Sequence, residues 1–135
     1  MTPAAMAALY ARAFPGGRPW SADEIARLMA APGFAVTTQA EFALGRAVAG
    51  EAELVTVAVD PGARRQGQGR ALLAAFDAQA RALGAETAFL EVAEDNTAAQ
   101  GLYRATGWVV TGRRKAYYRR ATGAVDAVMM TKVLG

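Results

Sequence analysis

The chain of 135 residues contains neither cysteine nor histidine. Without cysteine, the protein has no disulfide bonds, no zinc site built on thiolates and no thiol nucleophile. Without histidine it lacks the usual general base near pH 7, so a histidine-based catalytic triad is excluded. Any acid-base chemistry must come from carboxylates, tyrosine, lysine or ordered water. The sequence predicts no metal site.

Long hydrophobic runs are also missing. The apolar stretches, such as residues 54–59, have the length of a strand, far below the roughly 20 residues that a membrane-spanning helix needs. Residues 1–13 are rich in alanine but lack the basic start and leucine-rich core of a signal peptide. We therefore expect a cytoplasmic protein with no membrane contact.

Apolar residues are plentiful: 53% of the chain is hydrophobic and 20% is charged. This composition buries enough apolar surface for a globular fold, and the length suits one domain, which we expect to span residues 1–135. The net charge is +3, and residues 104–120 carry most of the excess without a single acid. This basic segment suits either an anionic partner or a solvated surface.

Hydrophobic periodicity and turn residues predict the secondary structure. A first helix starts at Thr2-Pro3 and a second at Ser21, where Glu24 completes a capping box. The remaining expected elements are strands at 34–38, 42–48 and 54–59, a helix at 70–83, a strand at 87–92, a helix at 97–105 and strands at 108–111 and 124–132, the last two joined by an irregular basic segment. This order predicts an α/β (α+β) fold, a mixed sheet flanked by helices with one β-α-β crossover.

A glycine-containing turn leads into the long helix at residues 60–70. A pyrophosphate group needs convergent backbone N–H groups, a positive helix end and close approach of the backbone. Gly67 and Gly69 would permit that approach, and Arg64, Arg65 and Arg70 would add positive charge. A tight turn with positive φ explains the two glycines equally well. The spacing matches neither the Walker nor the Rossmann motif.

Two residues further along the chain are candidates for acid-base chemistry. Glu91 stands in an otherwise apolar strand, where an ionised carboxylate is costly unless it is paired. It is either a catalytic base or a glutamate that reaches water or pairs with an arginine. Tyr103 follows Asn96 by seven residues, two helical turns, so both side chains can face one cleft. By itself a buried tyrosine usually only caps a carbonyl group.

Two motifs resemble those of the GNAT superfamily of N-acetyltransferases. Residues 64–69 (Arg-x-x-Gly-x-Gly) resemble its pyrophosphate-binding motif, and residues 96–108 (Asn-x-x-Ala-x-x-Leu-Tyr-x-x-x-Gly-Trp) resemble its second signature. The resemblance implies the GNAT fold, a mixed, mostly antiparallel sheet with a splayed central parallel pair. It also implies acetyl-CoA as the co-substrate.

The same resemblance implies roles for individual residues. Tyr103 is the general acid that protonates the departing CoA thiolate, and Glu91 is the general base, with Glu51 or Glu53 as the rival base. The backbone of the strand before the phosphate motif binds the pantetheine arm and polarises the thioester carbonyl. The residues implied at the cofactor are Val57, Ala58, Val59, Arg64, Arg65, Gln66, Gly67, Gln68, Gly69, Arg70 and Asn96.

Within the superfamily the chain resembles the bacterial ribosomal-protein alanine N-acetyltransferases. The likeness includes Pro19-Trp20-Ser21, Leu90-Glu91-Val92 and Tyr117-Tyr118. It implies direct transfer of acetyl to a protein N-terminal α-amine, with Trp20, Tyr117 and Tyr118 beside the acceptor, although the two tyrosines can equally be ordinary packing.

Three alternatives to this function are considered. The first is an acetyltransferase for a small-molecule amine or a lysine side chain, and the second is a non-catalytic acyl-CoA-binding regulatory module. A nucleic-acid-binding module is disfavoured, because no stacking motif accompanies the basic segment beyond Tyr117 and Tyr118.

Overall fold

The computed structural model describes residues 1–16, 18–38, 40–63 and 67–135. Arg64, Arg65 and Gln66, which the sequence assigns to the cofactor, lie outside the described residues, and the side chain of Gln68 is likewise not described. In chain order the elements are α1 (Pro3–Ala13), α2 (Ala22–Met29), β1 (Gly33–Thr37), β2 (Glu41–Val48), β3 (Glu51–Val59), the 3-10 turn η1 (Pro61–Ala63), α3 (Gln68–Ala82), β4 (Thr87–Ala93), α4 (Thr97–Ala105), β5 (Val109–Arg120) and β6 (Gly123–Val133).

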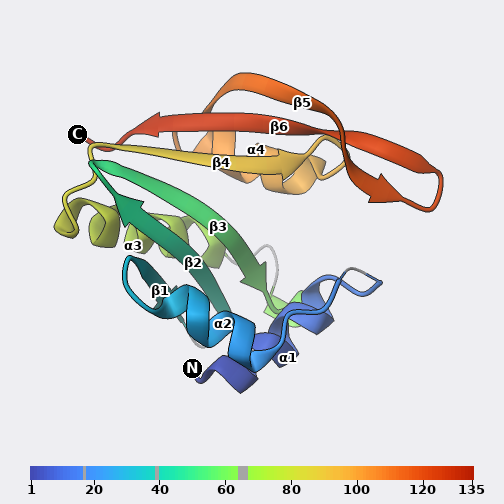
Figure 1. Cartoon of the computed structure of the whole chain (residues 1–135), viewed down its shortest axis with the longest axis horizontal. Helices are drawn as coiled ribbons and strands as arrows, with labels where there is room; N and C mark the ends of the chain where they lie inside the picture. The colour runs from blue at the N-terminus through green and yellow to red at the C-terminus, as the bar shows by residue number, and fades with distance from the viewer. Residues whose placement is uncertain (17, 39, 64–66) are drawn as a thin grey trace.

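The strands form one six-stranded sheet in the order β1-β2-β3-β4-β6-β5. Every neighbouring pair is antiparallel except β3 and β4, which run parallel and are joined by the crossover through α3. Helices α3 and α4 lie on one side of the sheet, whereas α1 and α2 lie over the other side (Figure 1). The expected mixed sheet with one β-α-β crossover is confirmed.

Two separate clusters of buried side chains hold these layers together. The larger one, here the α3/α4 core, includes Leu72 and Phe76 of α3, Leu90 of β4 and Met130 of β6. The smaller one, here the α1/α2 core, consists of Met6, Leu9, Ala13, Ile25, Phe42, Leu44 and Ala58. Each helix pair therefore buries its apolar face against a different side of the sheet.

The helix ends follow from local sequence as expected. The Thr2 hydroxyl accepts a hydrogen bond from the Ala5 backbone N–H at 3.1 Å and so caps α1. Ser21 and Glu24 form both halves of the capping box at the start of α2. After α3, Gly84 adopts a φ of +90°, the left-handed conformation in which helices commonly end.

The basic segment before the last strand departs from expectation, because it is a strand and not an irregular connection. Strand β5 extends over twelve residues and pairs with β6 along most of its length. Arg114 pairs with Ala127 and Tyr118 with Val125, so β5 has more residues than β6 between these two pairs. The additional residues form a bulge in β5, in which Ala116 has a φ of +52°. The charged side chains are compatible with a strand because β5 is at the sheet edge and they reach solvent and acidic partners.

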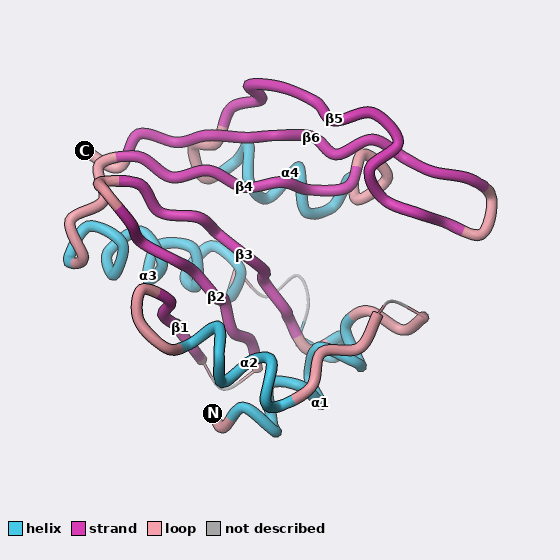
Figure 2. Tube along the Cα trace, viewed as in Figure 1, coloured by secondary structure: helices cyan, strands magenta, loops and turns pink. Residues whose placement is uncertain are grey.

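The central parallel pair is short, which opens the sheet. Residues Glu51 to Glu53 pair with Thr87 to Phe89, and the pairing then ends although both strands continue. Strand β3 also carries a bulge against β2, since Leu44 pairs with Thr56 and Gly45 with Leu54. Beyond the last pair, Glu53 with Phe89, strands β3 and β4 diverge, as Figures 1 and 2 show. The splayed parallel pair that the sequence resemblance implies is confirmed.

A buried carboxylate lies at the start of β2. Glu41 is fully buried, and neither of its carboxylate oxygens has a hydrogen-bond partner of acceptable geometry among the described residues. Burial raises the pKa of Glu41, and the side chain of Thr38 offsets this effect only in part. Ionisation of Glu41 in the folded protein therefore costs free energy of folding at neutral pH.

We predict that Glu41→Gln stabilises the protein at pH 8. The folded pKa lies above the unfolded one, so the cost is absent below the ordinary value of 4.5 and is complete above the folded pKa. A gain of about 1 kcal/mol corresponds to a Tm rise of roughly 3 to 6 °C. Thermal melts of both proteins at several pH values should show the gain vanishing toward pH 4. The exposed Glu86→Gln serves as the control, and a lower Tm for Glu41→Gln at pH 8 would contradict the prediction.

Candidate active site

The second half of β3 forms one side of the site, because it pairs with β2 on one edge but leaves the edge toward β4 unpaired. Val57, Ala58 and Val59 all lie beyond Glu53, the last residue that pairs with β4. Val57 packs against the α3/α4 core and Ala58 belongs to the α1/α2 core, so their side chains anchor the strand on both sides of the sheet. Backbone groups that would face a parallel neighbour here have no strand to bind, and such groups seek other partners.

The turn after β3 leads into a helix end that suits an anion. Gly67 is the N-cap of α3 with φ 75° and ψ 2°, and no side chain among the described residues caps the first turn. The leading N–H groups of a helix need partners, and the helix dipole makes this end favourable for negative charge. A Cβ atom at Gly67 would meet nothing within 4 Å, so its surroundings are open. Arg70 is exposed in the first turn of α3.

Gly69 has a packing reason that the sequence alone does not reveal. A Cβ atom at this position would come within 2.9 Å of Cδ2 of Leu102 in α4. The missing side chain therefore lets α4 lie against the start of α3. This contact brings the helix that carries Tyr103 next to the helix that follows the phosphate turn.

Tyr103 of α4 is nearly enclosed, with 8% of its surface exposed. Its ring lies 6.1 Å from that of Trp108, centroid to centroid. Burial, with a smaller contribution from Tyr118, raises the pKa of Tyr103 to about 12. The hydroxyl group therefore keeps its proton throughout the neutral range and is available as a proton donor.

Asn96 has a structural role at the start of the same helix. Its Oδ1 atom accepts a hydrogen bond from the Ala99 backbone N–H at 3.2 Å and so caps α4. The sequence expectation that Asn96 contacts a cofactor stays a prediction beside this capping role.

Glu91 stands on β4, beyond the last residue that pairs with β3. Its side chain lies on the face opposite the buried Leu90 and Val92, and 24% of it is exposed. Arg114 of β5 donates a hydrogen bond from Nε to Oε1 of Glu91 at 2.8 Å. Of the sequence alternatives, pairing with an arginine is thus the one observed, and the surroundings of Glu91 are not wholly apolar.

The rival carboxylates lie elsewhere on the sheet. Glu51 and Glu53 belong to the part of β3 that still pairs with β4. Glu91 instead lies two residues past Phe89, where the strands have separated. This difference favours Glu91 as the carboxylate nearest a bound substrate.

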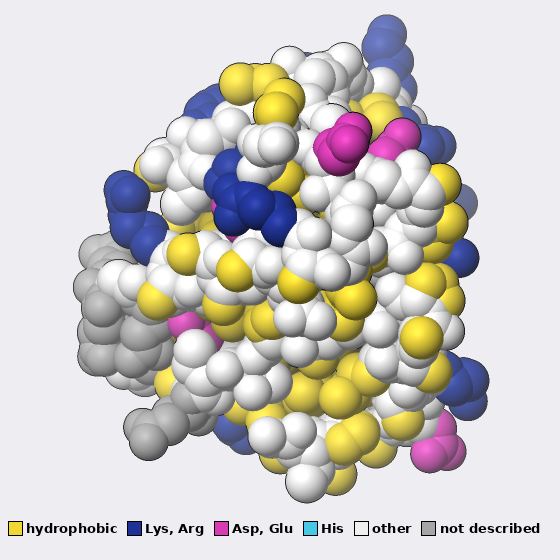
Figure 3. All heavy atoms as spheres, turned by 90° about the vertical axis from the view of Figure 1, so that its left-hand side faces the viewer, with side chains coloured by type: hydrophobic (Ala, Val, Ile, Leu, Met, Phe, Trp, Pro, Cys, Tyr) yellow, Lys and Arg dark blue, Asp and Glu magenta, His cyan; other side chains and the backbone are white. Residues whose placement is uncertain are grey.

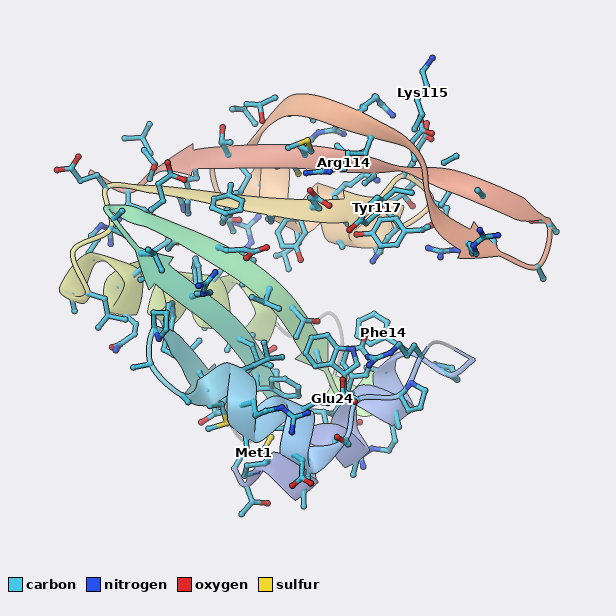
Figure 4. All side chains as sticks on the ribbon, in the orientation of Figure 1. Met1, Phe14, Glu24, Arg114, Lys115 and Tyr117 are labelled. Atoms are coloured by element: carbon cyan, nitrogen blue, oxygen red, sulfur yellow. The ribbon has the colours of Figure 1, made fainter. Side chains whose placement is uncertain are left out.

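Aromatic side chains from two distant parts of the chain flank the splayed region. The Tyr10 ring lies 4.7 Å from that of Phe14 and 5.4 Å from that of Trp20, near the end of α1. On β5, Tyr117 and Tyr118 meet edge to face at 5.1 Å. Tyr117 and Phe14 point toward each other from the two sides, as Figure 4 shows.

Sequence reasoning did not single out Tyr10 and Phe14, which form an aromatic group with Trp20. The signal was available in their spacing, since residues four apart on a helix share a face. Burial is the main cause that raises the pKa of Tyr118, and nearby Glu91 raises it further.

The rest of the described chain carries no sign of another ligand class. Within it, no group of three or more acidic side chains could hold a metal ion. None of the helices in the described ranges is both long and apolar enough to cross a membrane. On the face seen in Figure 3, the Lys and Arg side chains stand apart from one another.

Comparison with known proteins agrees with this arrangement. The model of the Acetyltransferase (GNAT) family matches residues 5–108. The [Ribosomal protein bS18]-alanine N-acetyltransferase of Escherichia coli K12 is 41% identical over 91 residues, which cover 67% of this chain and 62% of that protein. The matched part of the chain thus spans less than two thirds of that relative.

Two further relatives match nearly the whole chain. N-alpha-acetyltransferase RimI of Mycobacterium tuberculosis is 36% identical over an alignment of 139 positions, which covers 96% of this chain and 85% of that protein. The crystal structure of the ribosomal-protein-S18-alanine N-acetyltransferase from Escherichia coli superposes with a TM-score of 0.85 at 33% identity, covering 98% of this chain and 87% of that one. With its splayed parallel strands and these matches, the chain belongs to the GNAT family of acetyltransferases.

Proposed function

We propose that this protein is an acetyl-CoA-dependent N-acetyltransferase that transfers acetyl directly to a protein N-terminal α-amine. The observation that carries the proposal is the divergence of β3 and β4, with Glu91 of β4 beyond the point of separation and Tyr103 on α4, the helix that follows β4 in the chain. Similarity to proteins named ribosomal bS18-alanine N-acetyltransferases supports a ribosomal protein as the acceptor.

The residues present fit acetyl-CoA, the acetyl donor that the GNAT family uses. The unpaired backbone of Val57 to Val59 offers hydrogen-bonding groups to the amides of an extended pantetheine arm. The uncapped start of α3 at Gly67, with Arg70 beside it, offers N–H groups and positive charge to a pyrophosphate. The thioester then lies between β3 and β4, at the level of Glu91.

In this arrangement Glu91 accepts a proton from the acceptor amine, directly or through one water molecule. The amine nitrogen forms a bond to the thioester carbon, and the backbone of β3 polarises the carbonyl group. The carbon–sulfur bond breaks, and Tyr103 gives its proton to the sulfur. The burial that holds the pKa of Tyr103 at about 12 also disfavours a free thiolate in the same surroundings, which favours this transfer. Proton exchange with solvent returns both residues to their starting states.

The acid-base chemistry of the acceptor favours an N-terminal amine over a lysine. An α-amine titrates near 7.7 to 8.0 and a lysine amine near 10.4, so the neutral lysine nucleophile costs about 3 to 4 kcal/mol more at pH 7. In the proposed site, which has no histidine, the carboxylate of Glu91 is the group that bears this cost. The aromatic side chains of Phe14 and Tyr117, which point toward each other, favour an extended N-terminus with a small first residue.

The acceptor preference is tested with peptides that carry both a free N-terminus and an internal lysine. We expect acetylation at the α-amine of peptides that begin with Ala or Ser, including the N-terminus of a ribosomal protein. Mass spectrometry locates the acetyl group, and N-terminally blocked versions of the same peptides serve as controls. Acetyl groups found mainly on lysine would exclude the N-terminal assignment and leave an acetyltransferase of another specificity. Acetyl-CoA binding without any transfer would indicate a non-catalytic module.

We expect Tyr103→Phe to lower turnover by roughly 10²-fold, the usual effect of losing a general acid. The substitution keeps the ring against Trp108 and removes only the proton donor. Binding of acetyl-CoA, measured as the rise in Tm that the ligand causes, should stay unchanged. Near-normal turnover would assign Tyr103 to packing alone.

The identity of the base is tested by comparing three carboxylates. Glu91→Gln should lower turnover by about 10²-fold or more, because the amide cannot accept the proton. Glu51→Gln and Glu53→Gln are matched controls on the paired part of β3 and should remain within a few-fold of the unmodified protein. The opposite ranking, read from initial rates of CoA release, would move the base to β3.

A further inference from the structure

The ion pair between Glu91 and Arg114 raises a question about the proposed base. A cation in contact with a carboxylate stabilises its charge, and a carboxylate with both oxygens held by an arginine has fewer lone pairs left to accept a proton from an amine. Whether Arg114 blocks Glu91 in this way depends on how many of the carboxylate oxygens it contacts. Nε of Arg114 lies 2.8 Å from Oε1 of Glu91, and no partner of Oε2 is found among the described residues.

A second ion pair from the same strand shows the contrasting geometry. Arg120 donates from Nε to Oδ2 of Asp95 at 2.9 Å and from a terminal nitrogen to Oδ1 at 3.0 Å. Both oxygens of Asp95 are therefore engaged, as in a bidentate pair. Arg114 engages only Oε1 of Glu91. It therefore holds the carboxylate in place and leaves Oε2 available to accept a proton.

The conformation of Arg114 is itself held by its neighbours. Its guanidinium carbon lies 5.7 Å from the centre of the Tyr117 ring, and Tyr117 packs edge to face on Tyr118. Figure 4 shows Arg114 and Tyr117 close together, whereas Lys115, between them in sequence, points away. Arg114 is thus confined by contacts on two sides, the carboxylate and the ring.

The bulge in β5 produces this arrangement. Residues in a regular strand alternate between faces, but the bulge between Arg114 and Tyr118 changes the alternation. Ala116, with its positive φ, donates its backbone N–H to Oδ1 of Asp126 at 2.9 Å, which ties the bulge to β6. This hydrogen bond to Asp126 holds Ala116 in its strained backbone conformation next to the site.

We propose that Arg114 is a positioning residue, which holds Oε1 of Glu91 so that Oε2 faces the acceptor amine. The proposal rests on the proposed role of Glu91 as the base. It gives the basic segment of β5 a function in the reaction that needs no contact between Arg114 and either substrate.

The test compares Arg114→Gln with Arg114→Lys and with Arg113→Gln as the matched control. Arg113 precedes Arg114, pairs with Glu94 at 3.2 Å and carries the same charge, but does not contact Glu91. We expect kcat to fall about 10-fold in Arg114→Gln, with the KM for acetyl-CoA unchanged, because the carboxylate loses its fixed orientation. Arg114→Lys should recover part of the loss, and Arg113→Gln should stay within about 2-fold.

A double-mutant cycle separates action through Glu91 from a merely structural effect. If Arg114 acts through Glu91, Arg114→Gln should cause no further loss of turnover in the Glu91→Gln background. An equal loss in both backgrounds, or unchanged kcat in Arg114→Gln alone, would overturn the positioning role while leaving Glu91 as the base. Unchanged turnover in Glu91→Gln would instead remove the base assignment on which the role depends, so the two failures are distinguishable.

Discussion

The site depends on the early end of backbone pairing between two parallel strands. Only Glu51 to Glu53 pair with β4, although β3 continues to Val59. Buried backbone groups without partners are costly, so the separation must be imposed by stronger packing on each side. The resulting free edge of β3 is the part of the sheet to which the proposed cofactor site is assigned.

Packing against both faces of the sheet imposes this separation. Before the bulge, Ala52 and Leu54 of β3 belong to the α3/α4 core, and beyond it Ala58 belongs to the α1/α2 core. Opposite the bulge, a side chain at Gly45 would collide with the stacked rings of Phe34 and Phe76. The change of face thus places β3 between two cores, which draws it away from β4.

Much of this structure could be predicted from the sequence, because it follows from local signals. Thr2, Ser21 and Gly84 mark helix ends through chemistry contained within a few residues. The separation of β3 from β4 was implied by family resemblance, and the structure agrees. The helix ends need no distant partner to specify their conformation, whereas the separation of β3 from β4 depends on packing and was indicated by the resemblance alone.

Features that depend on distant contacts were not predictable. The strand character of β5 was missed because its charges suggest an irregular segment, and the acids that pair with Arg113 and Arg114 lie on β4 and just after it. The pairing of Glu91 was left open between two alternatives for the same reason. The packing role of Gly69 depends on Leu102 of a different helix, so no local pattern reveals it.

The cations of β5 also affect how one molecule meets another. Strand β5 forms an edge of the sheet, and a long edge offers a template on which a strand of a second copy can be added. Lys115 and Arg119 would bring like charges together if two such edges met, whereas Arg113, Arg114 and Arg120 are already paired with acids. The segment that contacts Glu91 therefore also disfavours edge-to-edge pairing between copies. A β5 without these charges would favour aggregation and would also leave Glu91 without its ion-pair partner.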